Sequence, residues 1–130
     1  MINVPKMLPG LYLIRHGETA WSLSGQHTGR TDIPLTEKGE RDVGKLADRL
    51  RAVTFSRIFT SPLQRARRTC ELTGLGEVAE VEPDLAEWNY GAYEGQRAVD
   101  IRKGRQTGIS FEMDVQAVNR LPKFPNVQIS

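Results

Sequence analysis

Cysteine and long apolar runs are scarce in this 130-residue sequence. Its single cysteine, Cys70, cannot form a disulfide within the chain, which is typical of proteins in a reducing compartment. No apolar stretch approaches the length needed to cross a bilayer, so we expect no membrane partner. The N-terminal residues MINVPKMLPG lack the apolar core and small-residue cleavage site of a secretory signal, so the sequence predicts a cytoplasmic location.

A large excess of charge of one sign is also missing. The sequence has 18 lysines and arginines against 16 aspartates and glutamates, which gives a formal net charge of +2. So small a charge gives no reason to expect nucleic acid as a partner. With 38% hydrophobic and 26% charged residues, the composition is that of a globular protein, and the length fits one domain or a portion of one.

Three short apolar segments predict strands. LYLIR, residues 11–15, is a continuous apolar run, which is typical of a strand buried on both faces of a parallel sheet. The other two predicted strands lie within residues 56–62 and 78–85. Residues 17–34 are rich in glycine, serine and threonine without a sustained period, so we expect a long functional loop there.

Two helices are predicted between these strands. The first begins after Thr36, which can cap it, and its apolar residues recur at helical spacing to about Val53. The second covers residues 63–74 and ends at Gly74. Strands that alternate with helices in this order predict an α/β fold with a parallel sheet.

Histidine is the next scarce residue, and one of the two histidines has a suggestive position. His16 follows the predicted strand directly, between Arg15 and Gly17. Most lone histidines are surface or core residues, but ligands of α/β sheets bind at the carboxyl ends of strands. A neutral imidazole can attack phosphorus, and guanidinium groups match phosphate oxygens. The pair predicts phosphoryl transfer through a covalent phosphohistidine.

Arginines are concentrated in TSPLQRARRT, residues 60–69, at the start of the second predicted helix. We interpret Arg67 and Arg68 as a solvated helix face. Arg65 lies near the helix N-terminus, where unpaired N–H groups favour an anion, so we predict that it binds phosphate.

Glu87 lies in DLAEWNYGAYEG, after the third predicted strand. On composition alone it would be a surface carboxylate. Beside a phosphate and shielded by Trp88 and Tyr90, it would have a raised pKa and could protonate a leaving oxygen. We therefore retain it as a candidate general acid.

Four segments together resemble one known family. RHGETAW, TDIPLTEKG, FTSPLQRARRT and LAEWNYGAYEG are similar, in this order, to the signatures of the histidine phosphatase superfamily, the phosphoglycerate-mutase-like proteins. The resemblance covers about residues 11–104. It implies a three-layer α/β/α fold with a mostly parallel sheet that is incomplete at its C-terminus. Residues 1–104 would be the N-terminal portion of such a domain, and residues 105–130 a poorly ordered tail of another kind.

The resemblance also implies roles for particular residues. His16 would be the nucleophile, Arg15 and Arg65 would bind the phosphoryl oxygens, and Glu87 would act as general acid and base. No metal or cofactor is implied. The implied substrate-binding residues are Arg15, Ser22, Thr28, Gly29, Arg65 and Glu87.

The substrate implied is a small sugar phosphate or bisphosphate. The segments SGQHTGRTDIPLT and LAEWNYGAYEG are more similar to the sugar-bisphosphatase branch, which includes sedoheptulose bisphosphatase, than to the mutases. Two alternatives stay open. One is a mutase that returns the phosphoryl group to its substrate, and the other is a catalytically impaired module that binds phosphate esters.

The sequence departs from the family pattern near its end. The family uses a second histidine late in the chain, and this sequence has only His27, which we interpret as a loop residue. Residues 106–124 can be back-translated so that one added cytosine gives PDWNLFRDGCPGGESPAQV, which resembles the expected family segment. Our hypothesis is that loss of one nucleotide replaced the original C-terminal part with an out-of-frame tail.

Overall fold

The computed structural model describes residues 10–105, which form four helices and one pair of short strands. The segment predicted as a tail lies outside the described residues from residue 106 onward. Within the described range, no helix is both long and apolar enough to cross a membrane. The elements are α1 (Ala20–Ser24), α2 (Glu37–Leu50), β1 (Phe59–Thr60), α3 (Gln64–Leu72), β2 (Glu80–Val81) and α4 (Ala98–Arg105), with 3-10 turns at Pro83–Leu85 and Gly91–Tyr93.

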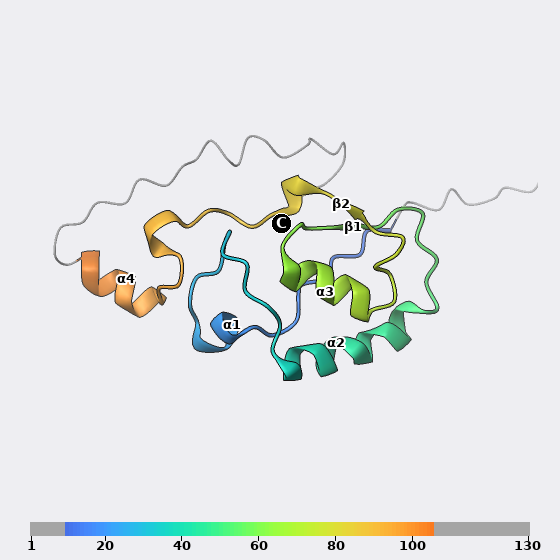
Figure 1. Cartoon of the computed structure of the whole chain (residues 1–130), viewed down its shortest axis with the longest axis horizontal. Coiled ribbons are helices and arrows are strands. Elements are labelled where there is room, and N and C mark those ends of the chain that lie inside the picture. The colour runs from blue at the N-terminus through green and yellow to red at the C-terminus, as the bar shows by residue number, and fades with distance from the viewer. Residues whose placement is uncertain (1–9, 106–130) are drawn as a thin grey trace, which may run out of the picture.

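The strands β1 and β2 pair in parallel, with Phe59 opposite Glu80 and Thr60 opposite Val81. Helix α3 connects them and lies between the strand pair and α2 (Figure 1). This arrangement confirms the predicted α/β class and the parallel pairing. Both strands lie inside the predicted segments but are much shorter than these.

Helix α2 forms as the sequence pattern predicts. The Thr36 hydroxyl accepts a hydrogen bond from the Gly39 N–H at 3.0 Å, which caps the helix start. Val43 and Leu50 lie about two turns apart on one face of the helix and are the buried hydrophobic residues of the described core. The helix ends at Leu50, three residues before the predicted end at Val53.

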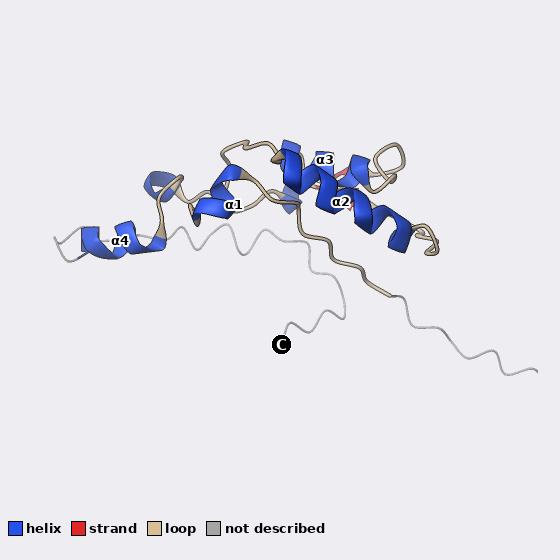
Figure 2. Ribbon diagram, turned by 90° about the horizontal axis from the view of Figure 1, so that it is seen from below, coloured by secondary structure: helices blue, strands red, loops and turns tan. Residues whose placement is uncertain are grey.

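The prediction of a strand at residues 11–15 is wrong for the described chain. This segment forms no strand and lies extended away from the helices (Figure 2), with 69% of Leu11 and 86% of Leu13 exposed. An apolar run shows that a segment would gain free energy from burial, but a strand also needs a neighbour with which to pair. Neither strand of the described residues pairs with it.

The predicted loop at residues 17–34 contains the short helix α1. Thr19 and Ser22 form a reciprocal capping box at its start, in which each side chain accepts a hydrogen bond from the other residue's backbone N–H. Thr19 is fully buried. The rest of the loop has no regular structure, in agreement with the prediction.

Two glycines let the turn after residue 16 approach the start of α2 closely. A Cβ on Gly17 would lie 2.7 Å from Cγ2 of Val43, and a Cβ on Gly39 would overlap the carbonyl oxygen of Glu18. The Thr36 N–H also donates to this oxygen at 2.9 Å. Gly17 therefore permits close packing against α2.

We expect Gly39→Ala to destabilise the chain by about 1–3 kcal/mol, because the added methyl group forces the Glu18 backbone away from α2. The matched substitution Gly44→Ala lies in the same helix and meets nothing within 4 Å. It should stabilise the chain by about 0.5–1 kcal/mol through helix propensity. Urea unfolding monitored by circular dichroism measures both changes. Equal stabilisation by the two alanines would contradict this packing.

Candidate active site

His16 lies at the end of the extended segment, with its ring half-buried. Its Nδ1 is 2.8 Å from the carbonyl oxygen of Gly17. Because a carbonyl oxygen only accepts hydrogen bonds, Nδ1 carries the proton of the neutral ring. The lone pair then belongs to Nε2, which is the atom available for attack on an electrophile.

Burial lowers the pKa of His16 below its ordinary value of 6.5, and the hydrogen bond to the Gly17 carbonyl opposes this effect. The positive charges of Arg65 and Arg15 lower the pKa further, while the negative charge of Glu87 raises it. The ring is therefore neutral, and so nucleophilic, near pH 7. These charge effects indicate that Arg15, Arg65 and Glu87 lie within electrostatic range of the ring.

The lowered pKa links His16 to folding. The folded chain binds this proton more weakly than the unfolded chain does, so protonation opposes folding. The contribution of His16 to stability is complete above pH 6.5 and is lost as the pH falls through the folded-state pKa.

Arg65 is 2% exposed, and its guanidinium group points into the loop that precedes α2 in the sequence. Nη1 donates to the Thr31 carbonyl at 3.0 Å, and Nη2 donates to the carbonyls of Gly29 at 2.8 Å and Thr28 at 3.5 Å. Among residues 10–105, no carboxylate forms an ion pair with Arg65. A buried cation without a counter-ion is costly, so this group favours an anion beside it.

The N-terminus of α3 does not provide the open anion site that the sequence suggests. Asp32 accepts a hydrogen bond from the Gln64 N–H at 2.7 Å, and its own backbone carbonyl accepts one from the Gln64 side chain. A carboxylate of the chain therefore already occupies the start of this helix. The attraction for an anion comes from the buried guanidinium of Arg65 instead.

Thr69, which the sequence pattern did not single out, connects α3 to the turn after His16. Its hydroxyl accepts a hydrogen bond from the Gly17 N–H at 3.0 Å and donates to the Arg65 carbonyl at 2.8 Å. The side chain is 4% exposed. Its position four residues after Arg65, inside TSPLQRARRT, was the available signal, since such residues share a helix face.

The three predicted loop residues have different surroundings. Thr28 and Gly29 contact the guanidinium of Arg65 through their carbonyls. Ser22 is exposed, and its hydroxyl is used in the capping box of α1. The structure thus places Thr28 and Gly29 against Arg65, whereas the Ser22 side chain caps helix α1.

Glu87 lies on an exposed segment, and its backbone carbonyl accepts a hydrogen bond from Nε of Arg30 at 3.0 Å. Trp88 is 45% exposed and Glu87 itself is exposed, so the shielding expected from the tryptophan does not occur. Burial raises the pKa of the Tyr90 hydroxyl, as do the negative charges of Glu87 and Glu94. The Tyr90 hydroxyl therefore stays protonated at neutral pH.

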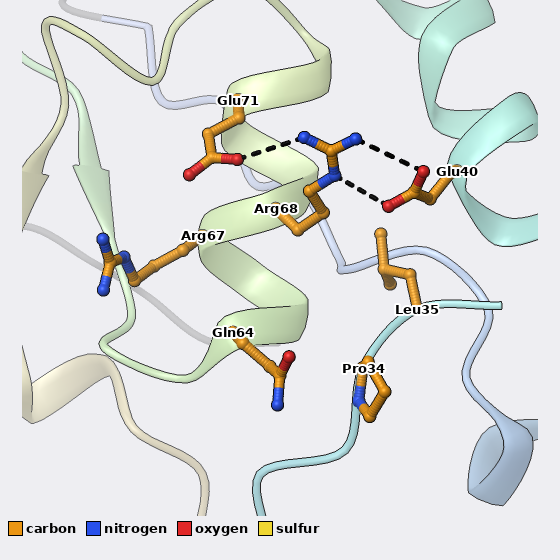
Figure 3. A pocket seen from close by; sticks show the side chains of 7 residues that line it. All are labelled: Pro34, Leu35, Glu40, Gln64, Arg67, Arg68 and Glu71. Carbon is orange, nitrogen blue, oxygen red and sulfur yellow. Dashed lines mark hydrogen bonds and ion pairs between the residues drawn. The ribbon is translucent and has the colours of Figure 1, made fainter. Parts of the chain in front are cut away.

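A separate pocket of about 250 Å³ lies between α2 and α3 (Figure 3). Arg68 crosses it, with Nε 2.7 Å from Glu40 and Nη1 3.3 Å from Glu71. The lining contains none of the predicted site residues.

Arg67 and Arg68 are exposed, which confirms the predicted solvated face of the helix. Within the described range, no cluster of three or more histidine, cysteine or acidic residues could hold a metal ion.

Comparison with known proteins agrees with this geometry. The family model of the histidine phosphatase superfamily (branch 1) matches residues 11–118. The chain belongs to this superfamily. His16, with Arg15 and Arg65 around it, lies within the matched range, so the resemblance inferred from the four sequence segments is confirmed.

Relatives within the histidine phosphatase superfamily carry several activities in their names. A sedoheptulose 1,7-bisphosphatase from Saccharomyces cerevisiae is 37% identical, over 78% of this chain and 44% of that protein. An acid phosphatase from Mycobacterium tuberculosis is 45% identical, over 72% and 46%. A probable phosphoglycerate mutase from Cronobacter sakazakii is 39% identical, over 75% and 46%. The chain thus spans less than half the length of these relatives.

A solved structure from the superfamily has the same fold over the shared region. The phosphoserine phosphatase of Entamoeba histolytica, in complex with 3-phosphoglyceric acid, superimposes with a TM-score of 0.62 at 31% identity. The match covers 67% of this chain and 44% of that one. The α/β arrangement around His16 is therefore that of a histidine phosphatase.

We expect a histidine NMR titration to give His16 a midpoint below 6.5, with the signal assigned by its loss in His16→Asn. Arg15→Gln should raise this midpoint, because it removes a positive charge that disfavours the imidazolium. Arg102→Gln, on exposed α4, removes an equal charge away from the site and should leave the midpoint unchanged. A midpoint at or above 6.5 would exclude the described environment of the ring.

Proposed function

We propose that this chain transfers the phosphoryl group of a small phosphate ester to His16 and then to water. The observation that carries the proposal is the buried guanidinium of Arg65. It forms no ion pair with a carboxylate of the described residues, and its charge helps to keep the His16 imidazole neutral. Positive charges beside a nucleophile are the arrangement that phosphoryl transfer requires, because this reaction needs little from the protein beyond positioning and charge.

In the proposed first step, Nε2 of His16 attacks the phosphorus atom and the bond from phosphorus to the ester oxygen breaks. Glu87 gives its proton to the departing alkoxide, so an alcohol leaves. Arg15 and Arg65 balance the negative charge of the phosphoryl oxygens. The product of this step is a phosphohistidine.

In the proposed second step, the ionised Glu87 takes a proton from water, and the oxygen of that water attacks the phosphohistidine. The bond between nitrogen and phosphorus breaks, inorganic phosphate leaves and His16 regains its lone pair. Glu87 is protonated again and ready for another cycle. The arginines take the role that a metal cation has in other phosphatases.

The proposed substrate is a sugar phosphate or bisphosphate, and the proposed location is the cytoplasm. Similarity to the yeast sedoheptulose 1,7-bisphosphatase supports the substrate class. The single cysteine supports a reducing compartment. No nucleic acid or membrane is part of this proposal.

Two alternatives differ from this proposal. The relatives named as phosphoglycerate mutases favour a transferase that returns the phosphoryl group to a phosphoglycerate, and a requirement for bisphosphoglycerate would identify it. The other alternative is a module that binds phosphate esters with little turnover.

We expect the purified chain, incubated with a panel of ³²P-labelled sugar phosphates, to release inorganic phosphate and to carry an acid-labile label on His16. His16→Ala should abolish both signals, whereas His27→Ala should keep the label. Glu87→Gln should slow turnover of alkyl phosphates by about 10²–10⁴, the usual contribution of a general acid.

Circular dichroism of each variant shows whether its fold is retained. Phosphate release that survives His16→Ala would refute the covalent mechanism. Saturable binding of sugar phosphates without labelling or turnover would favour the binding module.

A further inference from the structure

Glu94 makes an unusual set of contacts for a carboxylate on a loop. Oε2 accepts hydrogen bonds from the Gly29 N–H at 3.1 Å and from the Thr31 hydroxyl at 2.7 Å. Oε1 accepts from the N–H groups of Arg30 at 2.9 Å and Tyr90 at 3.2 Å. All four donors are neutral, and they come from two segments that are far apart in the sequence.

Glu94 and Arg65 hold the same loop from two sides. The carbonyls of residues 28, 29 and 31 accept hydrogen bonds from Arg65, whereas the N–H groups of residues 29 and 30 donate to Glu94. One charged group thus binds the acceptors of the loop and the opposite charge binds its donors. Arg65 and Glu94 form no ion pair with each other. Each instead fixes the loop through hydrogen bonds in which one partner is charged, and such bonds are stronger than those between two neutral groups.

The loop in turn contacts the segment that carries Glu87. Arg30 contributes two hydrogen bonds to this contact. Its side-chain Nε donates to the Glu87 carbonyl at 3.0 Å, and its backbone N–H donates to Glu94. A Cβ on Gly29 would overlap the Trp88 carbonyl oxygen and Oε1 of Glu94, so the two segments are in tight contact. Backbone hydrogen bonds between His27 and residues 95 and 96 extend this contact.

The four hydrogen bonds also act on the carboxylate. Burial raises the pKa of Glu94, but the Thr31 hydroxyl and the three backbone N–H groups outweigh this effect and leave the pKa below its ordinary value. Glu94 is therefore ionised at neutral pH. Its negative charge strengthens the hydrogen bonds from the loop, and the carboxylate holds no proton to transfer.

We propose that Glu94 is a positioning residue, which fixes the loop 28–31 and thereby sets the place of Glu87 relative to Arg65 and His16. The inference rests on the proposed function, because Glu87 is the acid of that mechanism. Glu94 touches no reacting atom in this account. Its effect reaches the chemistry through Arg30 and the backbone of Glu87.

The leaving group of the substrate separates positioning of the acid from general damage to the fold. An alkyl phosphate leaves as a basic alkoxide and needs the proton of Glu87, whereas an aryl phosphate such as p-nitrophenyl phosphate leaves readily without it. Glu94→Gln keeps the size of the side chain but puts an NH₂ group where two donors need an acceptor. The exposed Glu77→Gln is the matched control on the same full-length chain.

We expect Glu94→Gln to raise the ratio of aryl to alkyl phosphate turnover by about tenfold or more, a part of the about 10²–10⁴ that a general acid supplies. Glu77→Gln should leave the ratio unchanged, and Glu94→Asp, which keeps the charge, should fall between the two. An equal loss on both substrates, or no loss, would overturn the proposal, because it would indicate a role in stability alone or no role.

Amide hydrogen exchange tests the positioning without any turnover. Glu94→Gln should speed exchange at Gly29, Arg30 and Tyr90 and leave the amides of α3 protected. A wild-type chain without turnover would count against the proposed function, and selective loss of protection would still support the positioning of the loop by Glu94. Unchanged protection at these three amides would overturn the inference whether or not the chain is active.

Discussion

The buried guanidinium of Arg65 is the interaction on which the described structure depends most. It satisfies carbonyls of three loop residues and lies near His16, yet no carboxylate within the described range forms an ion pair with it. An arginine in this position gives the loop a fixed shape and leaves a positive charge that an incoming anion can balance. Structure and proposed chemistry therefore share one side chain.

The other contacts around the site hold His16 near this charge. Thr69 joins the Gly17 N–H to the backbone of Arg65, while Gly17 and Gly39 allow the turn to pack on α2. These contacts join segments that lie far apart in the sequence, since Gly17 and Thr69 are separated by 52 positions. They explain how a chain with a small buried hydrophobic core still places His16 beside α3.

Much of the fold could be predicted from sequence where the signal is local. Thr36 as a cap, the face of α2 with Val43 and Leu50, and the parallel order of strands and helices depend on neighbouring residues. The strand at residues 11–15 could not be judged in this way, since a strand exists only beside a partner. His16 and Arg65 could be singled out from their positions after predicted strands, although residues 11–15 form no strand among the described residues.

The remaining features of the site depend on contacts across the chain. Asp32 occupies the start of α3, and Glu94 binds a loop more than sixty residues away, as the separations of 63 to 65 positions indicate. No periodic pattern in the sequence indicates such long-range contacts. Glu94 lies inside the segment LAEWNYGAYEG that carries the family resemblance, but only the structure shows what its carboxylate contacts.

The most direct test of the central claim is an NMR titration of the full chain with inorganic phosphate, which follows the Nε–H of Arg65 and the ring of His16. The account predicts that both signals shift together and saturably, and that bound phosphate raises the pKa of His16 because an anion favours the imidazolium. Phosphate that shifts the exposed Arg67 and Arg68 but neither Arg65 nor His16 would contradict it.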